Sequence, residues 1–484
     1  MRARVPWDSL FTENARDILK AFHPFAAKVN INQNMLSLLE GLVGTEITLD
    51  VGGVAITYSK NDRGMDHGSL FQEPDRRPVR SEQLNYDYYE SKNEDPTSAE
   101  MAFIRPLKDV VPRLELLGFS LSPVRREYES VAESWRAQRE SFLDDDTSPL
   151  PDLMSFAEFR QFAIEHALES LDDTFVSSEN TERAEKIRGR FADAAVDRIP
   201  NYLAYDPNAY SERSFFGGLV GILHPYSVMR LLAEGKENGN ASVIWQYGPL
   251  LDAGWATEQE FVAGARRTET FLIATEGSSD VHILKHALAL LRPGIADFFR
   301  FIDVSESHLF SGTGNLVKFA EGLAKIDVQN QVVFLFDNDA EGLDAHQRLS
   351  RLTLPTNMRG TMLPELDAFR AFPAQGPEGL RNADINRRAA AIECYLDLNA
   401  GGHAAAKVLW TNYKKTLGVY QGALEYKEFY VQEFLKQTSE TIADGSYDVT
   451  RMEALLDLLI AECTAIPVKG WNLSSAQATP ASSV

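Results

Sequence analysis

The chain is 484 residues long, carries a formal net charge of −22, and is 44% hydrophobic and 24% charged. That length exceeds one ordinary hydrophobic core, so we expect about three domains. The strong acidity argues against a broad electrostatic surface for nucleic acid, although bound cations can offset clustered carboxylates locally. No apolar stretch approaches membrane-spanning length and no signal-peptide segment stands near the N-terminus, so we expect a cytoplasmic protein without a membrane partner.

Cysteine use excludes two further classes of protein. The chain has two cysteines, Cys394 and Cys463, and neither belongs to a CxxC pair. Zinc ribbons and disulfide frameworks need more cysteines at closer spacing. The pattern is ordinary for a reducing compartment.

Residues 1–145 are predicted to form a mixed α/β domain. After a helix candidate at 14–22, two alternating runs at 46–51 and 54–58 flank Gly52-Gly53 and predict a β-hairpin. Residues 98–118 predict a helix that stops at a glycine. The acidic, proline-containing stretch 143–151 is the best linker candidate in the chain.

Residues 146–266 predict a helical region. Ser155 is placed to cap a helix, and further helices are expected at 182–196 and 226–233. Beyond about residue 384 the pattern is helical again, including the aromatic-rich run 410–435, so residues 383–470 are predicted as a helical C-terminal part. Residues 471–484 have the composition of a disordered tail.

Residues 267–382 alternate strand and helix, and this order predicts a parallel α/β sheet with right-handed crossovers. The expected strands are 270–275, 298–304 and 331–336, and the expected helices are 279–291, 314–325 and 341–351.

Carboxylates follow two of these strands. Glu276 comes after the first strand, and Asp337 and Asp339 come after the third. In open α/β sheets, ligands bind at the carboxyl ends of the strands, and carboxylate oxygens are ligands for Mg²⁺. One acid at such a junction is usually a helix cap, but two acids two residues apart cannot both cap one helix. The three acids therefore predict a divalent-metal site.

These residues resemble the Toprim domain, which topoisomerases, bacterial primases, recombination mediators and OLD-family nucleases share. The resemblance rests on a strand ending in Glu276-Gly277 and, two strands later, on Asp337-x-Asp339-x-x-Gly342. It implies a Rossmann-like core and an Mg²⁺- or Mn²⁺-dependent endonuclease that hydrolyses phosphodiester bonds of DNA or RNA. Asp337 and Asp339 would hold the metal, and Glu276 would complete its ligands or relay a proton.

The branches of this group differ in their other parts. Primases and mediators carry cysteine-ligated zinc, and topoisomerases need a cleavage tyrosine on a separate domain, which no pattern marks here. OLD nucleases have the most similar site but carry an ABC-type ATPase, whereas this chain has no GxxxxGK[ST] loop. A separate ATPase or sensor protein is therefore an expected partner.

Other side chains extend the predicted site. Asp280 matches a Glu-Gly-x-x-Asp variant of the motif, and Asp384 and Glu393 stand where two-metal Toprim nucleases place additional ligands, on or near a helix. Lys427 lies in a segment that resembles the one carrying a catalytic lysine in the OLD branch. The alternatives are a place in the first helical turn for Asp280, surface ion pairs for Asp384 and Glu393, and a solvated helix face for Lys427.

Backbone amides near the same edge predict phosphate contacts. The candidates are Gly277, Gly312 and Gly314, the last two in a glycine-rich loop that opens a helix. A simple tight turn is the alternative for this loop.

The N-terminal part resembles the HEPN/Toprim-associated proteins of bacterial anti-phage defence. Residues 58–75 and 113–118 carry this resemblance, together with the long region without an ATPase loop that precedes the acids. It implies a defence effector that acts on nucleic acid, with a homodimer as a further expectation.

Two other functions are alternatives. HEPN ribonucleases use an Arg-x4-6-His pair without metal, and Arg160 and His166 fit this spacing in the predicted helical region. Two residues six apart on a helix do not share one face, so a helical domain that dimerises or senses a trigger competes with that role. The other alternative is a non-catalytic Toprim scaffold, in which the acids only mark the fold.

Overall fold

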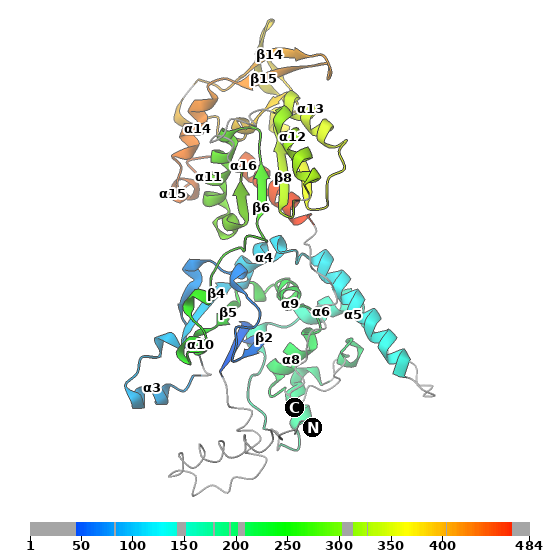
Figure 1. Cartoon of the computed structure of the whole chain (residues 1–484), viewed down its shortest axis with the longest axis vertical. Coiled ribbons are helices and arrows are strands. Elements are labelled where there is room, and N and C mark those ends of the chain that lie inside the picture. Colours follow the sequence, from blue (N-terminus) through cyan, green and yellow to red (C-terminus); the bar gives the residue numbers. More distant parts are fainter. Residues whose placement is uncertain are drawn as a thin grey trace, which may run out of the picture.

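The computed structural model describes residues 45–466, except 82–83, 143–151, 178–179, 193–194, 202–208, 303–312, 327 and 403. The described chain forms an N-terminal unit with an antiparallel sheet and a second unit built on a parallel sheet, stacked end to end (Figure 1). The helix predicted at 14–22, the linker predicted at 143–151 and the tail predicted at 471–484 lie outside the described residues.

A five-stranded antiparallel sheet of order β2-β1-β5-β4-β3 organises the N-terminal unit. Its strands are β1 (Glu46–Val51), β2 (Val54–Lys60), β3 (Arg76–Pro78), β4 (Met101–Pro106) and β5 (Ser242–Gln246). The predicted hairpin is confirmed as β1 and β2. Gly52 and Gly53 have φ of 56° and 83°, and this left-handed conformation is what a two-residue hairpin turn requires.

Two expectations for this unit differ from the structure. The first part of the helix predicted at 98–118 is strand β4, and only Leu107–Leu116 form helix α4. Strand β5 comes from the stretch 146–266 that we predicted to be helical, yet it lies between β1 and β4. The stretches 1–145 and 146–266 therefore share one sheet, because β5 is specified by its two partner strands and not by its own short sequence.

Helices surround this sheet. They are α3 (Tyr86–Lys92), α4, α5 (Leu121–Phe142), α6 (Phe156–Ile164), α7 (Arg183–Arg188), α8 (Glu212–Val220), α9 (Pro225–Leu232) and α10 (Gly248–Asp252). Ser155 caps α6 as predicted, because its hydroxyl accepts a hydrogen bond from the amide of Glu158. The helix expected at 182–196 is shorter, since α7 ends at Gly189, whose φ is 48°.

Across the described ranges, no single helix combines the length and apolar character needed to cross a membrane. Helices α8 and α9 meet that criterion only together, as a pair bent by 110°.

The second unit confirms the predicted alternation of strand and helix. Its parallel sheet has the order β10-β8-β6-β7, with strands β6 (Phe271–Ala274), β7 (Phe299–Phe301), β8 (Gln331–Phe336) and β10 (Met358–Met362). The helices are α11 (Ser278–Leu291), α12 (Thr313–Lys325) and α13 (Ala340–Leu349). Strand β8 is buried along its whole length. Alternate β8 residues pack against α12 and α13 on one face, and against the layer of α11 and α16 (Thr450–Thr464) on the other.

The prediction that residues 383–470 are helical is wrong for the first half of that range. A second sheet of order β12-β11-β14-β15 contains β11 (Phe372–Gly376), β12 (Gly379–Ala383), β14 (Val408–Lys414) and β15 (Val419–Leu424). The aromatic-rich run 410–435 forms the β14–β15 hairpin and then α14 (Lys427–Leu435), which α15 (Ser439–Ala443) and α16 follow. Trp410, Tyr413 and Tyr420 favour strand, and Gly418, with φ of 68°, lies in the turn.

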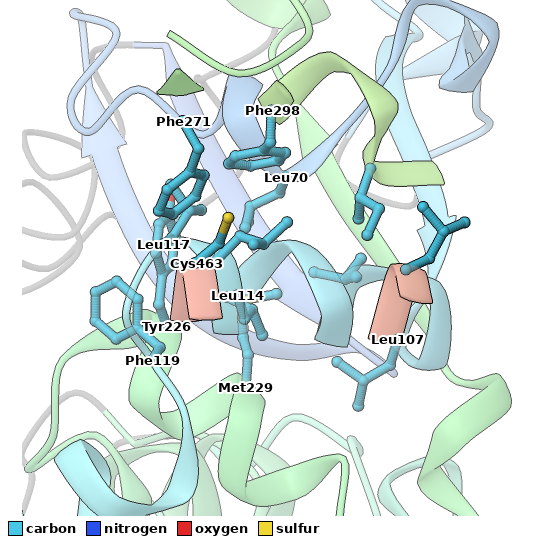
Figure 2. Packing of buried hydrophobic residues seen from close by; sticks show 14 of the residues in the cluster. Leu70, Leu107, Leu114, Leu117, Phe119, Tyr226, Met229, Phe271, Phe298 and Cys463 are labelled. Carbon is cyan, nitrogen blue, oxygen red and sulfur yellow. The ribbon is translucent and has the colours of Figure 1, made fainter. Parts of the chain in front are cut away.

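The two units meet through a shared hydrophobic cluster, which Figure 2 shows. It combines side chains from α4, α9, β6, α16 and the 3-10 helix η11 (Pro293–Phe298). Those drawn and labelled include Leu107, Leu114, Met229, Phe271, Phe298 and Cys463. Because Phe271 opens β6, the N-terminal unit packs directly against the strand that leads to Glu276.

A buried arginine crosses this junction. Arg113 on α4 is fully buried, and its Nη1 and Nη2 donate to the two carboxylate oxygens of Asp297 at 2.7 and 2.8 Å. Its Nε donates to the carbonyl of Ser69 at 2.8 Å. Burial alone raises the pKa of Asp297, but the hydrogen bonds and charge of Arg113 outweigh it and hold that pKa below its usual value. Ser69 and Arg113 belong to the segments 58–75 and 113–118, so both segments build the junction.

Replacing this arginine tests the junction. We expect Arg113→Met to lower the free energy of unfolding by about 3–5 kcal/mol, because Asp297 loses its partner in a partly buried site. The measurement is the midpoint of urea unfolding. The matched control is Arg125→Met on α5, where Arg125 forms an exposed pair with Glu129, and there we expect a change of less than about 0.5 kcal/mol. Equal effects of both variants would contradict the structural role of Arg113.

A buried histidine makes the N-terminal unit sensitive to acid. His67 is 2% exposed, with Nε2 2.9 Å from Oγ1 of Thr57 and Nδ1 3.1 Å from the hydroxyl of Tyr226. Burial lowers the pKa of His67 from 6.5 to about 3, against the opposing charge of Asp66 and with a further decrease caused by His224. Because the unfolded chain binds this proton more tightly, stability is full above pH 6.5 and falls as the pH drops toward 3.

We therefore expect wild-type protein to lose about 2 kcal/mol more stability than His67→Gln between about pH 7.5 and pH 5. The measurement is urea unfolding of both proteins at several pH values. His224, whose pKa burial lowers to about 4, titrates in both proteins and cancels in the difference. A difference that is independent of pH would show that His67 is not buried in its neutral form.

Candidate functional site

The order of the parallel sheet brings the predicted acids together. Strands β6 and β8 are adjacent and parallel, with Ala274 beside Phe334. Glu276 and Asp337 therefore emerge at the same edge, although they are far apart in sequence. The backbone amide of Asp337 donates to Oε1 of Glu276 at 3.2 Å. This bond joins the two halves of the predicted motif.

Gly342 explains the spacing of the Asp-x-Asp-x-x-Gly motif. Its amide donates to Oδ1 of Asp339 at 2.7 Å, so Asp339 caps helix α13. A Cβ atom at Gly342 would lie 2.2 Å from the carbonyl oxygen of Asp337, which is closer than any side chain tolerates. A residue without a side chain is therefore required where the helix begins. The capping role that we weighed as the alternative is real for Asp339.

Asn338, between the two aspartates, holds the loop in place through buried hydrogen bonds. It is 1% exposed and belongs to the short strand β9 (Asn338–Asp339), which pairs with β13 (Ala389–Ala390). Its Nδ2 donates to the carbonyl of Pro364 at 3.2 Å, and its Oδ1 accepts from the amide of Arg387 at 2.7 Å. Sequence reasoning missed this residue. An asparagine inside an acidic motif was the available signal, but its partners lie far along the chain.

Gln421 on β15 also holds this loop in place, through hydrogen bonds from the β14–β15 hairpin. Its Nε2 donates to Oδ2 of Asp339 at 2.5 Å, and its Oε1 accepts from the amides of Ala340 and Glu341 at 2.9 and 3.1 Å. One side chain therefore fixes both the carboxylate and the start of α13. Nothing in the sequence indicated Gln421, because the run that contains it was predicted to be helical.

Three further predicted residues gather beside Asp337. Asp280 lies in the first turn of α11, and Glu393 lies in the 3-10 helix η14 (Ile392–Tyr395). Lys427 is the first residue of α14, and its Nζ is 3.2 Å from Oε1 of Glu393. The charges of Asp280 and Glu393 both act on Asp337. Asp280 also accepts from the amide of Gly277 at 2.9 Å, so it has a structural role as well.

We define the acid cluster as Glu276, Asp280, Asp337, Asp339 and Glu393. Burial, followed by the charges of neighbouring acids, raises the pKa values of the first four. For Glu276, burial followed by the charge of Asp339 raises the pKa to about 8. For Asp280, burial and the charge of Glu393 raise it to about 6. For Asp337, burial and the charges of the four other acids raise it well above its usual value. The cluster is thus a buried site with an excess of negative charge.

Other predicted site residues are placed differently. Asp384 is exposed, and its Oδ1 accepts from the amide and the side chain of Asn386 at 3.0 Å. The amide of Gly277 is already engaged by Asp280, Gly314 lies within α12, and Gly312 lies outside the described residues.

The candidate ribonuclease pair has other contacts. Arg160 on α6 donates to Oε2 of Glu234 at 2.7 Å. His166 follows the end of α6, and the edge of its ring packs against Phe191 with centroids 5.0 Å apart. Burial lowers the pKa of His166. These contacts are those of a packed helix end.

The donor chemistry of the acid cluster fits a hard divalent cation, because every group is a carboxylate and Lys427 supplies one positive charge against five acids. In the part of the chain that the structure describes, no three Asp, Glu, His or Cys side chains already converge as ligands. The reason is visible in the hydrogen bonds. Asp339 is held by Gly342 and Gln421, and Oδ1 of Asp337 accepts from the amide of Ile392 at 3.1 Å. Side-chain rotation would accompany cation binding.

The structure thus defines a protein in which a mixed α/β N-terminal unit precedes a parallel sheet with acids at its carboxyl edge. Residues 43–269 match the family model described as HEPN/Toprim N-terminal domain 1. This match supports the predicted resemblance to the HEPN/Toprim-associated proteins, and the matched domain suggests a nuclease-related role. No curated protein and no solved structure matched the chain. The matched segment ends before β6, so the acid cluster lies outside it.

Removing one charge tests whether the acids repel one another. In the presence of a chelator, we expect Asp337→Asn to raise the free energy of unfolding by about 1–2 kcal/mol, because the amide keeps the bond from Ile392 and removes a buried charge. The matched control is Asp384→Asn, which lies at an exposed position and should change stability by less than about 0.5 kcal/mol. Thermal unfolding of the three proteins measures the difference. A loss of stability in Asp337→Asn would contradict the repulsion.

Proposed function

We propose that this protein is a Toprim-type nuclease that hydrolyses phosphodiester bonds of nucleic acid with Mg²⁺ or Mn²⁺ at the acid cluster. One observation carries the proposal. Glu276, Asp337 and Asp339 meet at the carboxyl edge of a parallel sheet, where burial and the charges of neighbouring acids raise their pKa values. Acids held at this cost in stability are typical of functional sites.

The residues present support distinct roles. Asp337 and Asp339 would hold the cation, with Glu276 as a third ligand or as the group that takes a proton from the attacking water. Asp280 and Glu393 stand next to them and would serve a second cation. Bound Mg²⁺ supplies the positive charge that lets an anionic oxygen approach an anionic phosphate. Asp384 is not part of this proposal, because it is exposed.

Lys427 is the cation nearest to this chemistry. It forms an ion pair with Glu393 and begins α14 at the edge of the cluster. Its ammonium group is placed to stabilise negative charge that develops on the phosphate oxygens during hydrolysis. The resemblance to OLD-type nucleases supports the same role.

The match of residues 43–269 to the HEPN/Toprim N-terminal domain supports a biological setting for this activity. We propose that the protein acts as an effector in bacterial anti-phage defence, in the cytoplasm, together with a separate ATPase or sensor protein. The reason for a separate partner is that the chain has no phosphate-binding loop of the GxxxxGK[ST] type. A homodimer would also be consistent with the family resemblance.

A cleavage assay tests the proposal. Purified protein is incubated with plasmid, single-stranded DNA and tRNA, with Mg²⁺, Mn²⁺ or EDTA. We expect cleavage that EDTA abolishes and that Glu276→Ala or Asp337→Ala lowers at least about a hundredfold, because each removes a group from the reacting centre. Lys427→Met should also be impaired. Lys436→Met is its control at the opposite end of α14, where Lys436 follows the last helical residue and pairs with Glu433 at 2.5 Å.

Two outcomes would contradict this function. Cleavage that survives EDTA and Asp337→Ala but is lost in His166→Ala would identify the metal-independent ribonuclease alternative. No cleavage of any substrate, together with no Mg²⁺-induced rise in melting temperature, would favour the non-catalytic scaffold.

A further inference from the structure

The β14–β15 hairpin lies directly over the acid cluster. Gln421 on β15 binds Asp339, and Lys414 on β14 forms an ion pair with Glu341 in the first turn of α13. The amide of Gly422 also donates to the carbonyl of Arg388, next to β13. Figure 1 shows this hairpin at the end of the second unit that is remote from the N-terminal unit. The side of the hairpin that carries Gln421 and Lys414 therefore contacts the site.

The opposite side of the hairpin carries exposed aromatic rings. Tyr413 and Tyr420 face each other across the two strands, are 52% and 50% exposed, and have ring centroids 5.1 Å apart. Trp410 joins them, with its ring centroid 6.4 Å from that of Tyr420. Side chains alternate between the two faces of a strand, so Tyr420 points away from the face on which Gln421 lies. We call Trp410, Tyr413 and Tyr420 the aromatic face.

The charges around the aromatic face indicate which form of nucleic acid it would bind. Lys414 is paired with Glu341 and Lys407 with Glu425. Among the described residues of the hairpin, this leaves Lys415, exposed in the turn, as the lysine without an ion pair. A surface built to bind duplex DNA would instead need many unpaired cations, because phosphates are what a duplex presents outward. Aromatic rings stack on any base whose face is uncovered, and only single strands expose such faces.

We propose that the aromatic face binds unpaired bases of single-stranded nucleic acid, on the side of the hairpin opposite to the acid cluster that would hold the phosphodiester bond. The position of the scissile bond rests on the proposed function, whereas the stacking contact does not. Tyr413 and Tyr420 contribute stacking surface, and Trp410 supports Tyr420 from the side. Because Lys414 and Lys407 are already paired and only Lys415 among the described lysines of the hairpin is not, affinity depends only weakly on salt.

Binding measured without cleavage tests this inference. The full chain carrying Asp337→Asn is titrated in EDTA into a fluorescent single strand of about 16 nucleotides, the upper range for one stacking platform, and anisotropy gives the Kd. We expect Tyr413→Ala and Tyr420→Ala each to weaken binding about tenfold, while the two Tyr→Phe variants bind like the parent. A duplex of the same sequence should bind more weakly and be insensitive to these changes.

Tyr88→Ala is the matched control, because Tyr88 on α3 is 50% exposed but belongs to the N-terminal unit. It should bind like the parent. Circular dichroism and light scattering on every variant show whether the fold or the oligomeric state changes. If Tyr413→Ala alters the oligomeric state, the aromatic face is covered by a second copy of the chain and the inference is wrong.

The remaining outcomes separate this inference from the nuclease proposal. Failure of the parent to bind the single strand, or equal binding by parent and alanine variants, overturns the inference even when cleavage is observed. Tyrosine-dependent binding without cleavage of any substrate supports the inference and counts against the nuclease. In an active enzyme, Tyr413→Ala should raise KM and leave kcat unchanged, because the aromatic face lies away from the reacting atoms.

Discussion

The adjacency of β6 and β8 in the parallel sheet is the constraint on which the candidate site depends. It places Glu276 beside Asp337 in one buried cluster of acids, where burial and the charges of neighbouring acids raise the pKa values of Glu276, Asp280 and Asp337. This repulsion opposes folding. It is offset by β8, whose apolar side chains are buried on both faces, each contributing about 1.5–3 kcal/mol. A strongly apolar strand therefore makes a strongly charged edge tolerable.

Uncharged polar side chains hold the charged ones in place. Asn338 fixes the loop from inside the protein, Gln421 fixes it from the β14–β15 hairpin, and Gly342 lets helix α13 begin close to Asp337. None of these three groups is an acid, yet they determine where the acids point. These hydrogen bonds fix the backbone of the loop, while the carboxylate side chains would still rotate if a cation bound. The same hairpin carries Gln421 toward Asp339 on one face and the exposed Tyr413 and Tyr420 on the other.

The N-terminal unit is joined to this site by a core that both units share. Phe271 at the start of β6 and Phe298 at the end of η11 pack against α4, and Arg113 binds Asp297 at the same junction. Separating the units would expose these rings and leave Asp297 without its partner. The segments 58–75 and 113–118, on which the family resemblance rested, are thus structural in large part. A change in the N-terminal unit has a direct route to β6 and so to Glu276.

What the sequence determined by itself was local. Continuous apolar runs, helix patterns and acids at strand ends predicted the elements from 270 to 351 and the placement of Glu276, Asp337 and Asp339, because these signals lie within a few residues of one another. The tertiary structure alone decided the strand order, the strand β5, the β14–β15 hairpin and the roles of Asn338 and Gln421. It also left Asp384 exposed and His166 beyond the end of its helix. The physical reason is that strand pairing and burial depend on partners far along the chain, and no local pattern encodes those partners.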